Sequence, residues 1–258
     1  FTKLQNQLGA SEGEMVKYQG VVKSVFNSGM GEDIGQVGDA VHQVTQNMGE
    51  LNEQELETVT KGALMLSQTF DADVNESTRG ANALMDAYGY TAEEAMDKVA
   101  WGFQNGLNFS GEFADNLAEY APLWEANGYS SEQMFAILQK GTEDGAYNLD
   151  YINDLVKEFG IRMQDGSKGT SDAMAQLSTG TQDLFKQFQN GELTVAEMQE
   201  AVVADLMKMD DTVKRNEIGV ALFGSKWEDM SGEAVLAMLD VDEALVNSEG
   251  TMNGMISK

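Results

Sequence analysis

Two short stretches share a pattern that describes how one helix ends and the next begins. AYGYTAEEAM covers residues 87–96, and ANGYSSEQMF covers residues 126–135. In the first stretch, Gly89 suits the left-handed position that ends a helix, and Thr91 suits the N-cap of the following helix. Glu94 stands three positions after Thr91, where its side chain would reach back to the N-cap amide and complete a capping box. A chain with this pattern is expected to build adjoining helices joined by short turns.

The remaining positions of the pattern predict the same geometry in both copies. Tyr90 lies directly before the N-cap, where an apolar ring packs on the first turn as a hydrophobic staple. In the second stretch these roles fall to Gly128 for the helix end, Tyr129 for the staple, and Ser130 with Gln133 for the capping box. We interpret these eight residues as structural helix caps and not as a binding motif used twice.

The similarity continues beyond the caps and indicates an internal repeat. Residues 84–106 and 123–145 are related by an offset of 39, with seven identities in 23 positions. A period near 40 built from helix pairs is typical of α-solenoids. The same cap pattern predicts N-caps at Ser110 and Asn148, and a degenerate third copy at Thr194 with Glu197. The identical pairs are Leu84/Leu123, Ala87/Ala126, Gly89/Gly128, Tyr90/Tyr129, Glu93/Glu132, Gly102/Gly141 and Gly106/Gly145.

Apolar residues recur at helical spacing along most of the chain. Ile34, Val37, Val41 and Val44 form one such stripe, and no run of alternating β-branched residues competes with it. The single proline, Pro122, falls within another stripe and predicts a kink or a break there. We expect an all-α fold, an irregular multi-helix array with repeated helix pairs and little or no β structure.

Composition shifts along the chain suggest four segments. We expect an N-terminal helical segment, a helix-pair repeat core, a C-terminal helical segment, and a flexible or truncated tail. Their ranges are 1–50, 51–165, 166–246 and 247–258.

The charge balance restricts the partners. Sixteen basic residues against 43 acidic ones give a net charge of −27, which repels nucleic-acid phosphates and disfavours direct nucleic-acid binding. There is no cysteine, so disulfides and thiol chemistry are excluded. No apolar run approaches the ~18–20 residues that cross a bilayer. The sequence starts at Phe1 and shows no apolar signal core there, so we expect it to be part of a longer protein.

Motifs for catalysis, cofactors or metals are weak. Asp71, Asp73 and Asn75 alternate as in a calcium loop, but Glu76 replaces the turn glycine, so we interpret them as cap residues. The only histidine, His42, has no companion motif. We therefore predict no catalytic, cofactor or metal site, and a structural or interaction protein instead of an enzyme.

Three ordered blocks between Ser24 and Leu239 resemble the globular helical core of phage and prophage tail tape measure proteins. They are VFNSGMGEDIGQVGDAVHQV, the region from ALMDAYGYTAEEAMDKV through NFSGEFADNLAEY to DYINDLVKEFGIRMQDGS, and EIGVALFGSKWEDMSGEAVLAML. The resemblance implies a non-enzymatic virion protein, assembled in the host cytoplasm into the tail. It also implies a role in setting tail length and in DNA delivery.

The partners that the resemblance implies are the tail tube protein, tail assembly chaperones and baseplate or distal tail proteins, with self-association as a trimer in the tail. This chain lacks the long coiled-coil heptads and apolar segments of that family, so a ruler role would belong to a longer parent. The alternatives are a free-standing helical-repeat adaptor that binds a protein partner and, with less support, an envelope-degrading enzyme.

Overall fold

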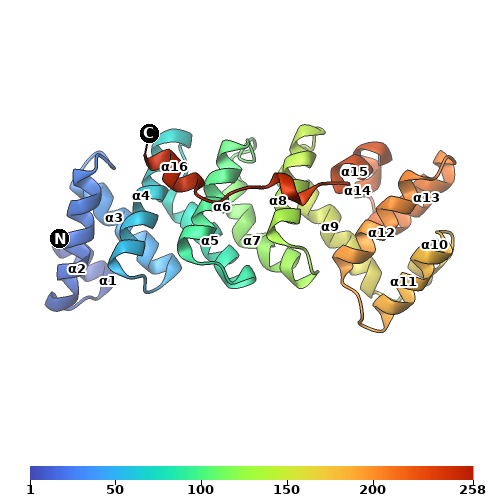
Figure 1. Ribbon diagram of the computed structural model, residues 1–258, viewed down its shortest axis with the longest axis horizontal. Coiled ribbons are helices and arrows are strands. Elements are labelled where there is room, and N and C mark those ends of the chain that lie inside the picture. The colour runs from blue at the N-terminus through green and yellow to red at the C-terminus, as the bar shows by residue number, and fades with distance from the viewer. Residues whose placement is uncertain (258) are drawn as a thin grey trace. The chain divides into compact units, whose positions relative to one another are not determined.

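The computed structural model describes residues 1–257, and the helices account for nearly all of its regular structure (Figure 1). The described residues form 16 α-helices and one 3-10 helix and contain no strand, which confirms the all-α prediction. The chain divides into two compact units. Unit 1 comprises residues 1–121 and 247–258, and unit 2 comprises residues 122–246.

Unit 1 contains seven complete helices and the first part of an eighth. Their bounds are α1 (Thr2–Leu8), α2 (Glu12–Asn27), α3 (Ile34–Met48), α4 (Glu53–Phe70), α5 (Val74–Tyr88), α6 (Ala92–Gln104), α7 (Phe113–Ala126) as far as Ala121, and α16 (Thr251–Ile256).

Unit 2 holds the end of α7 and the helices that follow it. Their bounds are α8 (Ser131–Glu143), α9 (Leu149–Gln164), α10 (Lys168–Met174), α11 (Thr179–Gln189), α12 (Val195–Met207), α13 (Thr212–Phe223), α14 (Lys226–Asp229), α15 (Gly232–Leu239) and the 3-10 helix η1 (Glu243–Leu245).

Within unit 1, α2, α3 and α4 each pack against the next helix and the one after it, and α5 packs against α6. This is the packing of stacked helix pairs, in which every helix buries an apolar stripe against its neighbours. Val37, Val41 and Val44 of α3 are fully buried, whereas Ile34 at the start of the predicted stripe is 45% exposed.

Within unit 2, the packing is less regular. The central helix α9 contacts α8, α12, α13 and α14, and α15 returns to pack on α8 and α12. The core beneath α9 is aromatic, because Phe159 stacks on Phe223 at 4.8 Å between ring centroids, and Phe223 stacks on Trp227 at 5.5 Å.

Helix α7 runs through Pro122 without a break, and the boundary between the units falls at this residue. The N-terminus of α7 differs from expectation. The helix begins at Phe113, whose amide donates to the Asn108 side chain at 3.2 Å, while the buried Ser110 hydroxyl makes no hydrogen bond. The cap predicted at Ser110 is therefore wrong, whereas Asn148 does cap α9.

The segment 247–258 was expected to be a flexible or truncated tail. Its residues 251–256 form α16, which packs against α4 and α6 of unit 1 (Figure 1). The Asp97 carboxylate accepts hydrogen bonds from the backbone amides of Gly250 and Met252, both at 2.8 Å. Met252 is 1% exposed and fills the space left by Gly62, where an added Cβ would lie 2.1 Å from its sulfur. The sequence shows no sign of this packing, because both anchors lie more than 150 residues away from the tail.

The other predicted segment boundaries, at residues 50 and 165, do not coincide with a unit boundary, whereas the one at residue 246 does. A compact unit is defined by packing between distant segments, and composition along the chain carries no record of that packing.

Candidate functional site

The two repeated stretches lie where helices begin, and each holds a capping box. Ahead of α6, the Thr91 hydroxyl accepts from the Glu94 amide at 3.3 Å, and the Glu94 carboxylate accepts from the Thr91 amide at 2.8 Å. The Thr91 hydroxyl also donates to the Glu94 carboxylate at 2.9 Å. The bond from the Thr91 amide, and secondarily the one from its hydroxyl, hold the pKa of Glu94 below its ordinary value. Gly89 has φ +74° and ends α5, and no atom lies near its Cβ position.

The second copy has the same box but a different environment. Ahead of α8, the Ser130 hydroxyl accepts from the Gln133 amide at 3.0 Å, and the Gln133 side chain accepts from the Ser130 amide at 2.9 Å. A Cβ on Gly128 would lie 2.4 Å from the Cβ of Thr194, and the Asn127 carbonyl accepts from the Ala196 amide at 3.0 Å. The turn before α8 is therefore packed onto the N-terminus of α12.

The two tyrosines of the repeat also differ. Tyr90 is half-buried, with the Lys98 ammonium 4.8 Å from its ring centroid. Tyr129 is 4% exposed, packs edge-on against Trp124, and donates its hydroxyl hydrogen bond to the Gln199 side-chain oxygen at 2.7 Å. Burial, and secondarily the negative charge of Glu200, raises the pKa of Tyr129 well above its ordinary value.

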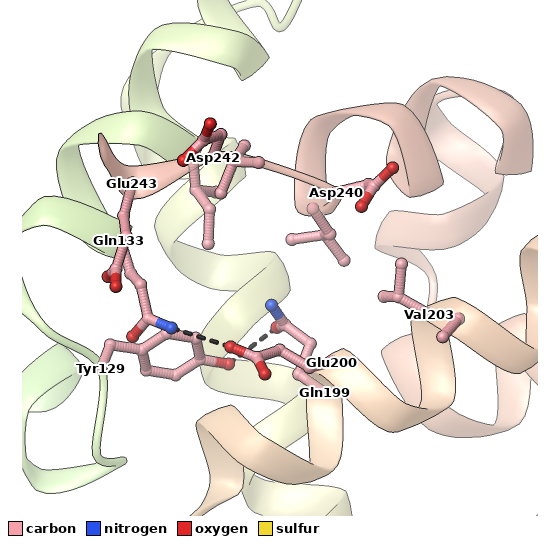
Figure 2. Close-up of a pocket in the computed structure, with 12 residues that line it drawn as sticks. Tyr129, Gln133, Gln199, Glu200, Val203, Asp240, Asp242 and Glu243 are labelled. Atoms are coloured by element: carbon pink, nitrogen blue, oxygen red, sulfur yellow. Dashed lines mark hydrogen bonds between the residues drawn. The ribbon is translucent and has the colours of Figure 1, made fainter. Parts of the chain in front are cut away.

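A cavity of about 370 Å³ in unit 2 adjoins this second copy (Figure 2). The beginning of α8, the middle of α12 and the segment after α15 form its walls. Both polar and apolar side chains line it. The lining residues are Tyr129, Gln133, Ile137, Gln199, Glu200, Val203, Ala204, Leu239, Asp240, Val241, Asp242 and Glu243.

Two carboxylates of this cavity are held by residues of the α8 capping box. The Gln133 amide donates to Glu200 at 2.9 Å, and the Ser130 hydroxyl donates to Glu243 at 2.8 Å. Partial desolvation, followed by repulsion from Glu243 and Glu197, raises the pKa of Glu200 above its ordinary value. Ser130 and Gln133 therefore cap a helix and orient two acidic side chains at once.

The sequence pattern located Tyr129, Ser130 and Gln133, but gave no sign of the residues that face them. Gln199, Glu200 and Glu243 lie 70, 67 and 113 residues from their respective hydrogen-bond partners. Their identities are ordinary for helix and loop surfaces, so only the packing of α8, α12 and the segment after α15 brings them together.

Outside this cavity, the structure gives the weak metal motif a capping role. Asp73 accepts from the Glu76 amide at 2.9 Å and caps α5, and Asp71 ends α4 in the left-handed region with φ +55°. In the described residues, no group of three or more His, Cys, Asp or Glu side chains has the geometry to hold a metal ion. No helix among residues 1–257 is both long enough and apolar enough to cross a bilayer.

These features define an all-helical protein built from capped, stacked helices, with a small acidic cavity on one of its units. The chain belongs to the family of phage-related minor tail proteins, whose model matches residues 2–224. A phage tail protein was expected from the sequence, and the family match confirms that broader expectation.

One curated relative is the uncharacterized protein YqbO of Bacillus subtilis (strain 168), with 25% identity over 228 residues. The match covers 88% of this chain but 14% of the relative, so the chain spans a small part of that protein's length. No solved structure matches the chain.

Proposed function

We propose that this chain is a segment of a tail tape measure protein, which helps to set tail length during assembly and assists DNA delivery. The observation that carries the proposal is the family match over residues 2–224, together with the three ordered blocks that resemble tape measure cores. The small share of YqbO that the chain covers is compatible with a much longer parent.

The proposal includes a non-enzymatic role and a set of tail partners. The tube protein, tail assembly chaperones and baseplate or distal tail proteins would bind the parent, which would self-associate as a trimer. Co-purification of the tagged parent with the tube protein and chaperones from an infected host tests the partners. A zymogram on peptidoglycan tests the absence of envelope-degrading activity, and a clearing band would contradict this part of the proposal.

Tail length tests the ruler role directly. In-frame deletions of helical blocks in the parent gene, outside the region encoding this chain, should shorten tails by ~1.5 Å for each residue removed. Negative-stain electron microscopy of purified virions measures the change. Intact tails of unchanged length after deletions of increasing size would reject the proposal.

The second candidate is a helical-repeat adaptor that binds a protein partner, and the acidic cavity of unit 2 is the observation in its favour. The two candidates differ in where the protein is found. Mass spectrometry of purified virions should detect peptides of this chain if it is a tail segment, and should detect none if it is a free adaptor.

A further inference from the structure

The cavity beside α8 contains several acidic groups and no basic one. Glu200, Asp240, Asp242 and Glu243 line it, and none of its other lining residues is Lys, Arg or His. In the part of the chain that the structure describes, none of these four carboxylates forms an ion pair. Clustered carboxylates without a counter-charge repel one another and attract a cation from outside.

Two of the carboxylates are oriented in advance. Glu200 is held through one oxygen by the Gln133 amide, and Glu243 is held through one oxygen by the Ser130 hydroxyl. In each case the donor is neutral, so the charge remains, and the second oxygen makes no further hydrogen bond to the described residues. The capping box therefore restrains both side chains and leaves an acceptor on each for a ligand.

Gln199 offers a hydrogen-bond donor to a ligand in the cavity. The residue is 2% exposed, and its side-chain oxygen accepts from the Tyr129 hydroxyl at 2.7 Å. Its amide nitrogen has no partner in the described residues and points into the cavity (Figure 2). The nitrogen is open to the space of the cavity, where the carbonyl oxygen of a ligand would accept its hydrogen bond.

The remaining wall of the cavity is apolar. Ile137, Val203 and Leu239 line it, together with Ala204 and Val241. Long basic side chains carry an aliphatic stem that packs on apolar surface while the charged head stays with polar partners. The volume of about 370 Å³ lies at the lower end of the usual range for ligand sites, and suits one such side chain with an adjoining peptide group.

We propose that this cavity binds a lysine or arginine side chain of a partner protein, with Glu200 and Glu243 on the cationic head and Gln199 on a neighbouring backbone carbonyl. The stem of the bound side chain lies along Ile137, Val203 and Leu239. The proposal does not depend on the tape measure assignment, because it concerns what the folded chain binds in solution.

Titration of the intact chain with short peptides tests the site. The probes are acetyl-Ala-Leu-Lys-Ala-Gly-amide and the same peptide with norleucine in place of lysine, which keeps the stem and removes the charge. The side-chain amide resonances of Gln199 and Gln133 in ¹H–¹⁵N spectra report binding. We expect saturable shifts with the lysine peptide and at least a tenfold weaker Kd with the norleucine peptide.

Matched variants distinguish binding in this cavity from non-specific attraction of a cation to the acidic surface. Glu200→Gln combined with Glu243→Gln should remove the tenfold preference for lysine. Glu192→Gln combined with Glu217→Gln removes the same charge from two exposed positions outside the cavity and should keep that preference. Equal binding of both peptides, or equal weakening by both double variants, would overturn the proposal.

Spermidine serves as a probe that carries positive charge but no carbonyl. Gln199→Met, with its fold verified by thermal melting, should weaken the lysine peptide several-fold and leave the Kd of spermidine unchanged. If Gln199→Met leaves both Kd values unchanged and spermidine binds as tightly as the peptide, the site takes free polyamines and the peptide proposal is wrong.

Discussion

At the scale of single residues, the same type of capping box serves two different purposes. Ahead of α6, Thr91 and Glu94 satisfy the first amides of a helix, and their surroundings are largely open. Ahead of α8, Ser130 and Gln133 do the same, and in addition hold acidic side chains that arrive from elsewhere in the chain. Capping boxes of the same geometry can therefore acquire different roles from the elements that pack against them.

Thr91→Ala should lower the free energy of unfolding by ~1 kcal/mol, because it removes the side-chain acceptor at an N-cap. Glu94 has a lowered pKa in the folded state, so its contribution is present above the ordinary carboxyl pKa and is lost as pH falls through the lowered value. The difference between wild type and variant in urea denaturation should therefore be larger at pH 7 than at pH 3. Thr58→Ala, whose hydroxyl bonds only to the Gln54 carbonyl within α4, is the control and should cause no comparable loss.

Glu200→Gln should have the opposite effect on stability. The raised pKa of Glu200 means that the folded state binds the proton more tightly than the unfolded state, so stability is lost as pH rises through that pKa. Glutamine resembles the protonated carboxyl, and the variant should melt at a higher temperature than wild type at pH 7 and at the same temperature near pH 3. Glu217→Gln, at an exposed position, should leave the melting temperature unchanged at both pH values. A lower melting temperature for Glu200→Gln at pH 7 would contradict the argument.

At the scale of elements, glycines within the repeat allow close packing of the following helix. A Cβ on Gly102 would lie 2.1 Å from the Phe113 ring, and a Cβ on Gly141 would lie 2.5 Å from Ile152. Each contact partner follows its glycine by eleven residues, so the repeat conserves a packing relation as well as a pair of caps. This relation explains two glycines that helix propensity alone would disfavour.

Gly102→Ala should destabilise the protein by roughly 1–3 kcal/mol, since the Phe113 ring is fully buried and has little room to move. Gly13→Ala is the matched control, because Gly13 lies within α2 with no atom near its Cβ position. That substitution should stabilise the protein by up to ~1 kcal/mol through helix propensity. Chemical denaturation of both variants measures the difference, and stabilisation by Gly102→Ala would show that Phe113 can rearrange.

At the scale of the whole molecule, local sequence signals predicted the helices and most of their caps. They did not predict the features that depend on packing between distant segments. The helical class and the caps at Thr91, Ser130, Asn148 and Thr194 follow from spacing within a few residues. Contacts between segments far apart in the chain form the acidic cavity, place α16 in unit 1 and set the unit boundaries. The periodicity of the sequence does not record such contacts. The cap assigned to Ser110 failed for a local reason, because the helix begins only at Phe113, whose amide donates to the Asn108 side chain.

Removal of residues 247–258 should destabilise unit 1 and leave unit 2 largely unaffected. Met252 and Met255 are both buried within unit 1, and a fully buried methionine contributes about 1.5–3 kcal/mol. Hydrogen exchange followed by mass spectrometry should show faster exchange in peptides from α4 and α6, with α9 and α12 as internal references. Equal acceleration in α9 and α12 would indicate that the two units unfold together.

The return of α16 to unit 1 has a mechanical consequence. The chain leaves unit 1 after Ala121 and re-enters it at Asn247, so unit 2 forms a loop between two points of unit 1. A pull applied between Phe1 and Ser257 is carried across the contact of α16 with α4 and α6, and unit 2 bears no tension while that contact holds. The Asp97 carboxylate and the Met252 side chain thus act as a latch that must open before unit 2 can be stretched.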